Sequence, residues 1–476
     1  MADRRTIARI GVRSIGGVIG VAVAVVVVGG ASLLPLPTFA VPAPAQTVKP
    51  VPADQQRVCP GSVLALAADT GQATRPSALG QPTVTSGTDG PKAAATALRP
   101  DADTTSSKQA PGVLTVQTPA GAKEPPLFAG SQVQTVTSDD LTGLAASACS
   151  EATADSWLVA GSTSLGQTSL VLLANPTSVD ATVDLSIWTE TGAVDAPGAT
   201  GIVVPAGAQK VVPLAGLAPS ATAPVVHVIA RGGQVVATMQ QSYEQGIEPR
   251  GVELSGATSG PSRTQIIPGL TVASMDAVQA AQSAEGVNVD FPALRVLVPG
   301  TEDAQLTVGT VGEAGTAVGD SFAQTVKAGS VAELPLQHLK DGSYTVTVHS
   351  SVPVVVAART TSVGTKSRDF AWFGAALELG DSLLATMPGG PNATLHLANA
   401  GDSDKKVTVK AADGHSSTLT VPAEGGAPLR LPGGAYTLTG ASGLRGSVSV
   451  QDDGAASSFV LTPPGALAAP IAVYPR

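Results

Sequence analysis

Residues 171–188 read VLLANPTSVDATVDLSIW, and residues 395–412 read LHLANAGDSDKKVTVKAA. Each stretch has apolar residues at alternate positions, then an asparagine and a polar turn. A second alternating run follows, and it begins eight residues after the asparagine, at Val183 or Val407. Because side chains alternate between the two faces of a strand, a period of two predicts a pair of half-buried strands. The recurrence of the whole pattern indicates a repeated structural module.

A third and less regular copy lies between these two. Leu294, Val296 and Val298 occupy the first strand, with Val298 in place of the asparagine, and Leu306 and Val308 occupy the second. Each copy continues with a Gly-containing turn, in VVPAGAQKVVPL, VKAGSVAELPL and VPAEGGAPLRL. Short strands separated by frequent turns are typical of β-sandwiches.

Composition supports the same fold class. Aromatic residues make up 3% of the 476 residues and charged residues 13%, with 53 Gly and 37 Pro, which suits strands and turns better than long charged helices. We therefore expect an all-β protein, an N-terminal transmembrane helix followed by tandem immunoglobulin-like β-sandwich modules. The expected modules are residues 156–258, 259–365 and 366–476, with a short helix or insertion at 271–286. Before them we expect a membrane or signal segment at 1–40, a Pro-rich spacer at 41–56, and a low-complexity region with short strands at 57–155 that a disulfide ties to the first module.

The N-terminal segment predicts export. Four arginines at positions 4, 5, 9 and 13 precede the uncharged apolar stretch Ile15–Leu34, whose 20 residues are long enough to cross a bilayer as a helix. The positive-inside rule places the N-terminus in the cytoplasm and the body outside, as a single-pass plasma-membrane protein. The alternative is a signal peptide cleaved near Ala40, which leaves a secreted protein.

The two cysteines, Cys59 and Cys149, lie in the exported part of the chain. An even number of cysteines in an exported protein predicts a structural disulfide. It would close a loop of roughly 90 residues and stabilise the fold by about 4–5 kcal/mol. The sequence has no CxxC pair and no histidine near either cysteine, so it does not suggest redox or metal chemistry.

Candidate functional residues are few. Asn175 with Pro176, and Asn399, fit a turn in which the amide bonds the backbone and proline fixes φ; ligand contact is the alternative. The five histidines have no metal-binding spacing, and no nucleophile–base set or phosphate loop is recognisable. We therefore expect a protein that is not an enzyme, with no catalytic residue, cofactor or metal. The net charge of −9 argues against a nucleic-acid partner.

Several of these segments together carry a family resemblance. They are the Arg-flanked anchor, the Pro-rich spacer, CPG at Cys59, ACS at Cys149, SWLVAG, SLVLLANPTSVDATVDLSIWTETG, VVPAGAQKVVPL and GGQVVATMQQS. The chain from Cys59 onward resembles the actinobacterial membrane-anchored secreted proteins grouped as a domain of unknown function. Because these motifs are structural, the resemblance implies export, a disulfide and the β fold, and it supplies no catalytic residue. Such proteins are often encoded near a membrane glycosyltransferase, which implies an envelope setting and makes that enzyme a candidate partner.

Two functions follow from this reading. The first is a non-enzymatic, membrane-anchored extracytoplasmic protein with a structural or protein-interaction role in the bacterial cell envelope. The alternative is a binding module for cell-wall glycan or another envelope polymer, an analogy with other sandwich folds. The low aromatic content and the acidic body argue against the second.

Overall fold

The structure, a computed structural model, describes residues 46–48, 53–66, 75–101, 104, 110–139, 141–283, 291–313, 319–463 and 471–473. The chain divides into two compact units, residues 1–49 with 470–476, and residues 50–469. In the first unit, β1 (Gln46–Val48) pairs antiparallel with β34 (Ile471–Val473), so part of the expected 41–56 spacer is a strand. The expected membrane or signal segment lies outside the described residues. Among the described residues, no helix has the length and apolar character that a membrane span requires.

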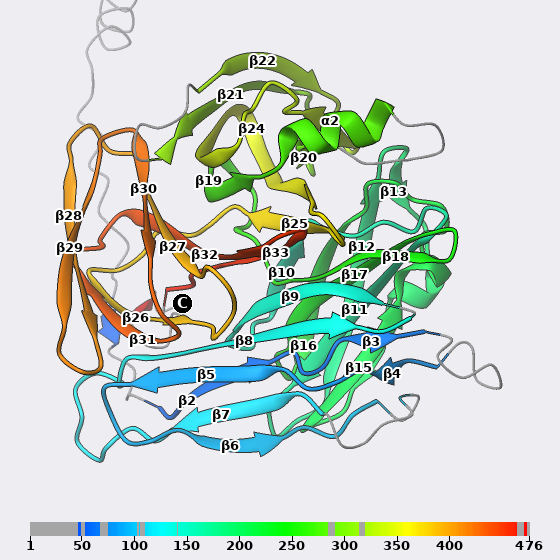
Figure 1. Ribbon diagram of the computed structural model, residues 1–476. Coiled ribbons are helices and arrows are strands. Elements are labelled where there is room, and N and C mark those ends of the chain that lie inside the picture. The colour runs from blue at the N-terminus through cyan, green and yellow to red at the C-terminus, as the bar shows by residue number, and fades with distance from the viewer. Residues whose placement is uncertain are drawn as a thin grey trace, which may run out of the picture. The chain divides into compact units, whose positions relative to one another are not determined.

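The second unit is mostly β and consists of many small antiparallel sheets (Figure 1). In the first module, one sheet has the order β15-β11-β17-β18 and the other β10-β16-β12-β13, with β14 also paired to β12. Apolar residues of both sheets, such as Val171 and Val183, share one buried core. The elements are β10 (Asp155–Leu158), β11 (Gln167–Asn175), β12 (Ala181–Thr189), β13 (Gly192–Val194), η2 (Pro197–Ala199), β14 (Ile202–Val204), β15 (Ala208–Pro213), η3 (Leu214–Gly216), β16 (Val225–Gly232), β17 (Val236–Gln245) and β18 (Glu248–Ser255).

The second module repeats this arrangement with one difference. Its strand β24 (Gly342–Val363) is 22 residues long, and the first part pairs with β19 and β21 while the last part pairs with β20 and β25. One strand therefore serves both sheets. The helix expected within 271–286 is present as α2. The other elements are β19 (Ser262–Val272), α2 (Met275–Ser283), β20 (Ala293–Leu297), β21 (Ala304–Gly312), β22 (Ser321–Val326), β23 (Val331–Pro335) and β25 (Arg368–Gly374).

The third module has the orders β30-β27-β32-β33 and β26-β31-β28-β29. The strands β11, β20 and β27, which begin the three sequence copies, are thus topologically equivalent, and so are the terminal strands β18, β25 and β33. The elements are β26 (Ser382–Met387), β27 (Thr394–Asn399), β28 (Lys405–Ala411), β29 (Ser416–Val421), β30 (Gly425–Arg430), β31 (Gly434–Thr439), β32 (Leu444–Asp452) and β33 (Ala455–Val460).

The structure differs from the expected modules at two places. Strand β25 pairs with β24, so the segment expected to open the third module instead completes a sheet of the second. The apolar pattern of RDFAWFG predicts a strand but does not reveal its partner. Residues 57–155 form their own sheets, β2-β7-β6, β5-β8-β9 and β3-β4. Both cysteines lie within that region, so the disulfide closes it on itself and does not tie it to the first module.

The strands of this N-terminal region are β2 (Gln55–Cys59), β3 (Leu64–Ala65), β4 (Ser77–Ala78), β5 (Thr83–Thr88), β6 (Ala94–Ala97), β7 (Gly112–Val116), β8 (Phe128–Thr137) and β9 (Thr142–Cys149). Like β18 and β33, β9 is the outermost strand of its sheet. Figure 1 shows β9, β25 and β33 in the middle of this unit, with the other sheets around them.

Candidate functional site

Four strands from four parts of the chain meet in a closed cycle. Strand β9 contacts β18, β18 contacts β25, β25 contacts β33, and β33 contacts β9. Each ends the strand order of its part of the fold, so each presents backbone N–H groups that no neighbouring strand binds. Such groups require another acceptor when they are buried.

Asp369 supplies that acceptor. Its Oδ2 accepts the N–H of Leu144 on β9 at 2.8 Å and that of Ala456 on β33 at 3.3 Å. Its Oδ1 accepts the N–H of Val252 on β18 at 3.1 Å and that of Phe370 on β25 at 3.0 Å. One buried carboxylate therefore holds all four strands, and it is 1% exposed.

Two glycines make room for this carboxylate. A Cβ at Gly251 would lie 2.5 Å from Asp369 Oδ1, and a Cβ at Gly143 would lie 2.7 Å from the Val252 nitrogen. Both glycines have positive φ, 145° and 153°, a conformation that other residues rarely adopt. The chain thus permits a close approach of β9 and β18 to β25.

A second acid, Glu253, directly follows Val252 on β18, and its side chain is fully buried. Ser457 Oγ lies 3.0 Å from its Oε1 and also accepts the N–H of Ala146 at 2.7 Å, while Oε2 has no hydrogen-bond partner among the described residues. Burial raises the pKa of Glu253 well above its ordinary value, and the charge of Asp369 raises it further.

Burial also raises the pKa of Asp369, but there four N–H donors oppose the rise. For Glu253 the hydroxyl of Ser457 and the backbone N–H of Ser458 oppose the rise in its pKa.

A cavity of about 340 Å³ lies further along the same four strands. Each strand contributes to its wall, through Ser147, Ser255, Trp372 and Ser458. The Ser255 Oγ atom has no hydrogen-bond partner in the described part of the chain. The volume is at the lower end of the range for small-ligand sites, roughly 300–1,000 Å³.

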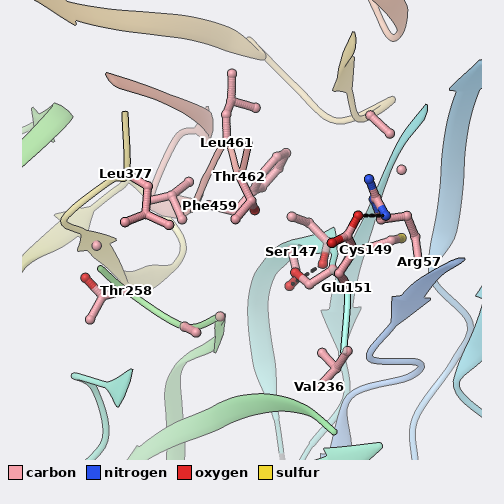
Figure 2. Close-up of a pocket in the computed structure, with 18 of the residues that line it drawn as sticks. Arg57, Ser147, Cys149, Glu151, Val236, Thr258, Leu377, Phe459, Leu461 and Thr462 are labelled. Atoms are coloured by element: carbon pink, nitrogen blue, oxygen red, sulfur yellow. Dashed lines mark hydrogen bonds and ion pairs between the residues drawn. The ribbon is translucent and has the colours of Figure 1, made fainter. Parts of the chain in front are cut away.

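The cavity has one charged side and one apolar side (Figure 2). Arg57 and Glu151 form an ion pair at 2.5 Å on the first, while Leu377, Phe459 and Leu461 lie across from them. The Arg57 guanidinium also donates to the carbonyls of Gln56 at 2.9 Å and Phe128 at 3.3 Å, and it lies 5.4 Å from the centre of the Phe128 ring. Burial lowers the pKa of Arg57 from its ordinary value, and Glu151 opposes that effect.

A third polar cluster joins the second and third modules. His396 Nδ1 lies 2.5 Å from Glu313 Oε2, and His396 Nε2 lies 2.8 Å from Ser449 Oγ. A serine, a histidine and an acid hydrogen-bonded in series also form the catalytic triad of many hydrolases. All three residues are at most 3% exposed, and none lines the cavity described above. Glu313 is further held by the N–H of Gly269 at 3.1 Å, as expected of a joint between modules.

Of the residues singled out from the sequence, Cys149 lines the cavity, and Asn175, Pro176 and Asn399 do not. Cys59 and Cys149 form the disulfide. Asn175 Nδ2 donates to the carbonyls of Val179 and Val204, and its Oδ1 accepts the N–H of Thr177 at 2.9 Å, with Pro176 inside this turn. The Asn399 amide makes the same set, to the carbonyls of Ser403 and Val421 and from the N–H of Gly401. These are structural turns at the ends of β11 and β27.

Asp369, Glu253 and Arg57 were not identified from the sequence. The available signal was an acid inside an apolar strand, in GVELS (251–255) and RDFAW (368–372). Such a charge is rarely buried without partners. No group of three or more His, Cys, Asp or Glu residues with metal-binding geometry occurs among the described residues.

The fold and this site define a mostly-β protein with one disulfide, whose edge strands converge on buried acids. The disulfide indicates an extracytoplasmic body. The model of a family of unknown function, DUF5719, matches residues 102–432, and the chain belongs to this family.

Curated proteins and solved structures show no close likeness to the chain. No curated protein matches the chain. A crystal structure of Thermotoga maritima 1070 is similar at 18% identity, over 25% of this chain and 95% of that one, with a TM-score of 0.21. A tetra-tandem repeat from the extending region of a large adhesion protein is similar at 13% identity, over 86% of this chain and 98% of that one, with a TM-score of 0.12. Neither likeness is close enough to carry an argument.

Proposed function

We propose that the chain is a non-enzymatic, membrane-anchored extracytoplasmic protein with a structural or protein-interaction role in the bacterial cell envelope. In this proposal, immunoglobulin-like modules and the N-terminal region close into one frame held outside the membrane by residues 1–40. The actinobacterial setting and a membrane glycosyltransferase as partner belong to the same proposal, and they rest on the sequence resemblance alone.

The observation that carries this proposal is the use of the buried polar groups. Asp369 binds the N–H groups of four strands, and His396 with Glu313 and Ser449 spans two modules. These are the groups from which a hydrolytic site would be built, and they are enclosed where parts of the fold join. A rigid frame with an outer interaction surface accounts for that arrangement better than catalysis does.

A first experiment tests the interaction role. The tagged full-length chain is crosslinked in its own membranes and captured, and partners are identified by mass spectrometry. We expect stoichiometric enrichment of one envelope protein, such as a membrane glycosyltransferase. Recovery of the chain without any such partner contradicts the interaction role.

A second experiment tests the absence of catalysis. Treatment of the full chain with a fluorophosphonate probe labels an accessible, activated serine of a triad. We expect no modification of Ser449, with the Ser449→Ala variant as the matched control. Labelling of Ser449 in the wild-type chain, lost in that variant, contradicts a non-enzymatic role.

The alternative, a module that binds cell-wall glycan or another envelope polymer, is less well supported. Sugars are commonly held against exposed aromatic rings, and the exposed large apolar side chains of the described residues are all aliphatic. Co-sedimentation of the full chain with isolated cell walls distinguishes this alternative, because only a polymer-binding module pellets with them.

A further inference from the structure

The cavity between the four strands has the chemistry of an amphiphile site. Among its lining residues, the charged ones are Arg57 and Glu151; the others are apolar or carry small hydroxyl groups. At about 30 Å³ for each water-sized group, a volume of 340 Å³ holds roughly eleven such groups. A ligand with one short alkyl chain and one polar head matches both the size and the division of the wall.

The apolar side favours an alkyl chain over a sugar. Leu377, which lines it, is 47% exposed, so an occupant would cover apolar surface that now contacts water. Two of the aromatic rings in the wall, those of Phe128 and Trp372, already have a guanidinium over one face. Arg57 lies over Phe128, and the Arg295 guanidinium lies 4.4 Å from the centre of the Trp372 ring.

The charged side already shows how the head would bind. The Arg57 side chain is 10% exposed, and two carbonyls and the Phe128 ring fix its position. Glu151 is 30% exposed, follows the end of β9, and has Arg57 as its ionic partner. The guanidinium is therefore the fixed member of the pair, and the Glu151 carboxylate is the member that can move to solvent. A ligand carboxylate has the same shape and charge as the group it would replace.

We propose that this cavity binds a single-chain alkyl carboxylate of about ten carbons. Its carboxylate replaces that of Glu151 on Arg57, and its chain lies against Leu377, Phe459 and Leu461. Glu151 thus acts as an internal competitor that occupies the head-group position in the empty protein.

The test uses the full chain in zwitterionic phospholipid nanodiscs and a diazirine derivative of decanoic acid as photolabel. Mass spectrometry maps the labelled peptides, and unlabelled decanoate competes. We expect saturable labelling within residues 377–386 or 457–463, and at least about tenfold weaker competition by decan-1-ol and decyltrimethylammonium, which lack the charge-assisted hydrogen bond. Labelling outside the cavity, or equal competition by decan-1-ol, overturns the proposal.

Four variants sharpen the result, each checked for folding by circular dichroism. Arg57→Gln should weaken decanoate binding about tenfold, whereas Glu151→Gln should strengthen it, because the internal competitor loses its charge. Ala257→Trp fills the cavity from a half-buried loop and should abolish binding. Asp413→Asn, which weakens the exposed pair with His415 away from the cavity, should leave affinity unchanged. If Glu151→Gln weakens binding as Arg57→Gln does, the pair is only structural and the proposal fails.

Discussion

The substitution Asp369→Asn tests the junction directly. The new side chain has the same shape but one oxygen acceptor, so it can satisfy one pair of N–H groups and turns its own NH₂ toward the other pair. The wild-type carboxylate accepts from Leu144, Val252, Phe370 and Ala456. At about 1.5–3 kcal/mol for each hydrogen bond to a charged group, losing two costs about 3–6 kcal/mol.

Removing a buried charge offsets part of this loss. We therefore expect the free energy of unfolding to fall by about 3 kcal/mol, the lower end of that range. The assay is urea denaturation of the full chain at neutral pH, followed by tryptophan fluorescence, since Trp372 lies on the same strand as Asp369.

The matched control is Asp303→Asn. Asp303 accepts one N–H, that of Ala328 at 2.9 Å, in an exposed turn, and asparagine keeps that acceptor. Its unfolding midpoint should stay close to that of the wild type. A loss of less than about 1 kcal/mol for Asp369→Asn, a typical surface effect, would refute the assigned role of the carboxylate.

Three further predictions concern other buried groups. Because the folded pKa of Glu253 is raised, its contribution to stability is fully present below the unfolded pKa near about 4.3 and is lost as pH rises through the folded value. Glu253→Gln should therefore flatten the decline in the unfolding midpoint as the pH rises above about 4.3, and an unchanged decline would contradict the assignment. His396→Ala removes one hydrogen-bond partner of the buried Glu313 and should cost about 1–3 kcal/mol in urea denaturation, whereas the exposed His415→Ala should have little effect; equal effects would contradict the proposed joint. Replacing Cys59 and Cys149 by serine together should lower the free energy of unfolding by about 4–5 kcal/mol, since the loop spans 90 residues, and a stability that does not change on reduction of the wild type would contradict this.

The repeated strands and turns could be predicted from the sequence, because they depend on neighbours along the chain. The period of two around Asn175 and Asn399 predicts strands that the structure contains, and the asparagines make matching hydrogen bonds at their ends. The α-helix at Met275–Ser283 also falls within the predicted stretch.

The junction could not be predicted in the same way. Asp369 is 225 residues from Leu144 and 117 from Val252, so its partners depend on how separate sheets pack. Modules arranged in a line and modules joined through their last strands would show the same alternation of apolar and polar residues along the chain. Within RDFAWFG, only the acid among apolar residues indicates that this strand has a buried polar role. For the same reason, the sequence pattern does not reveal that β25 pairs with β24 of the second module.

Native-state hydrogen exchange tests the central claim, that one carboxylate joins β9, β18, β25 and β33 into a single body. Amides of these four strands are compared in the wild type and in Asp369→Asn, with β12 and β28 as internal references away from the junction. We predict that the four strands share one level of protection in the wild type and lose it together in the variant, while β12 and β28 change less. Exchange of the four strands at unrelated levels in the wild type, or loss of protection in β25 alone in the variant, would contradict the account.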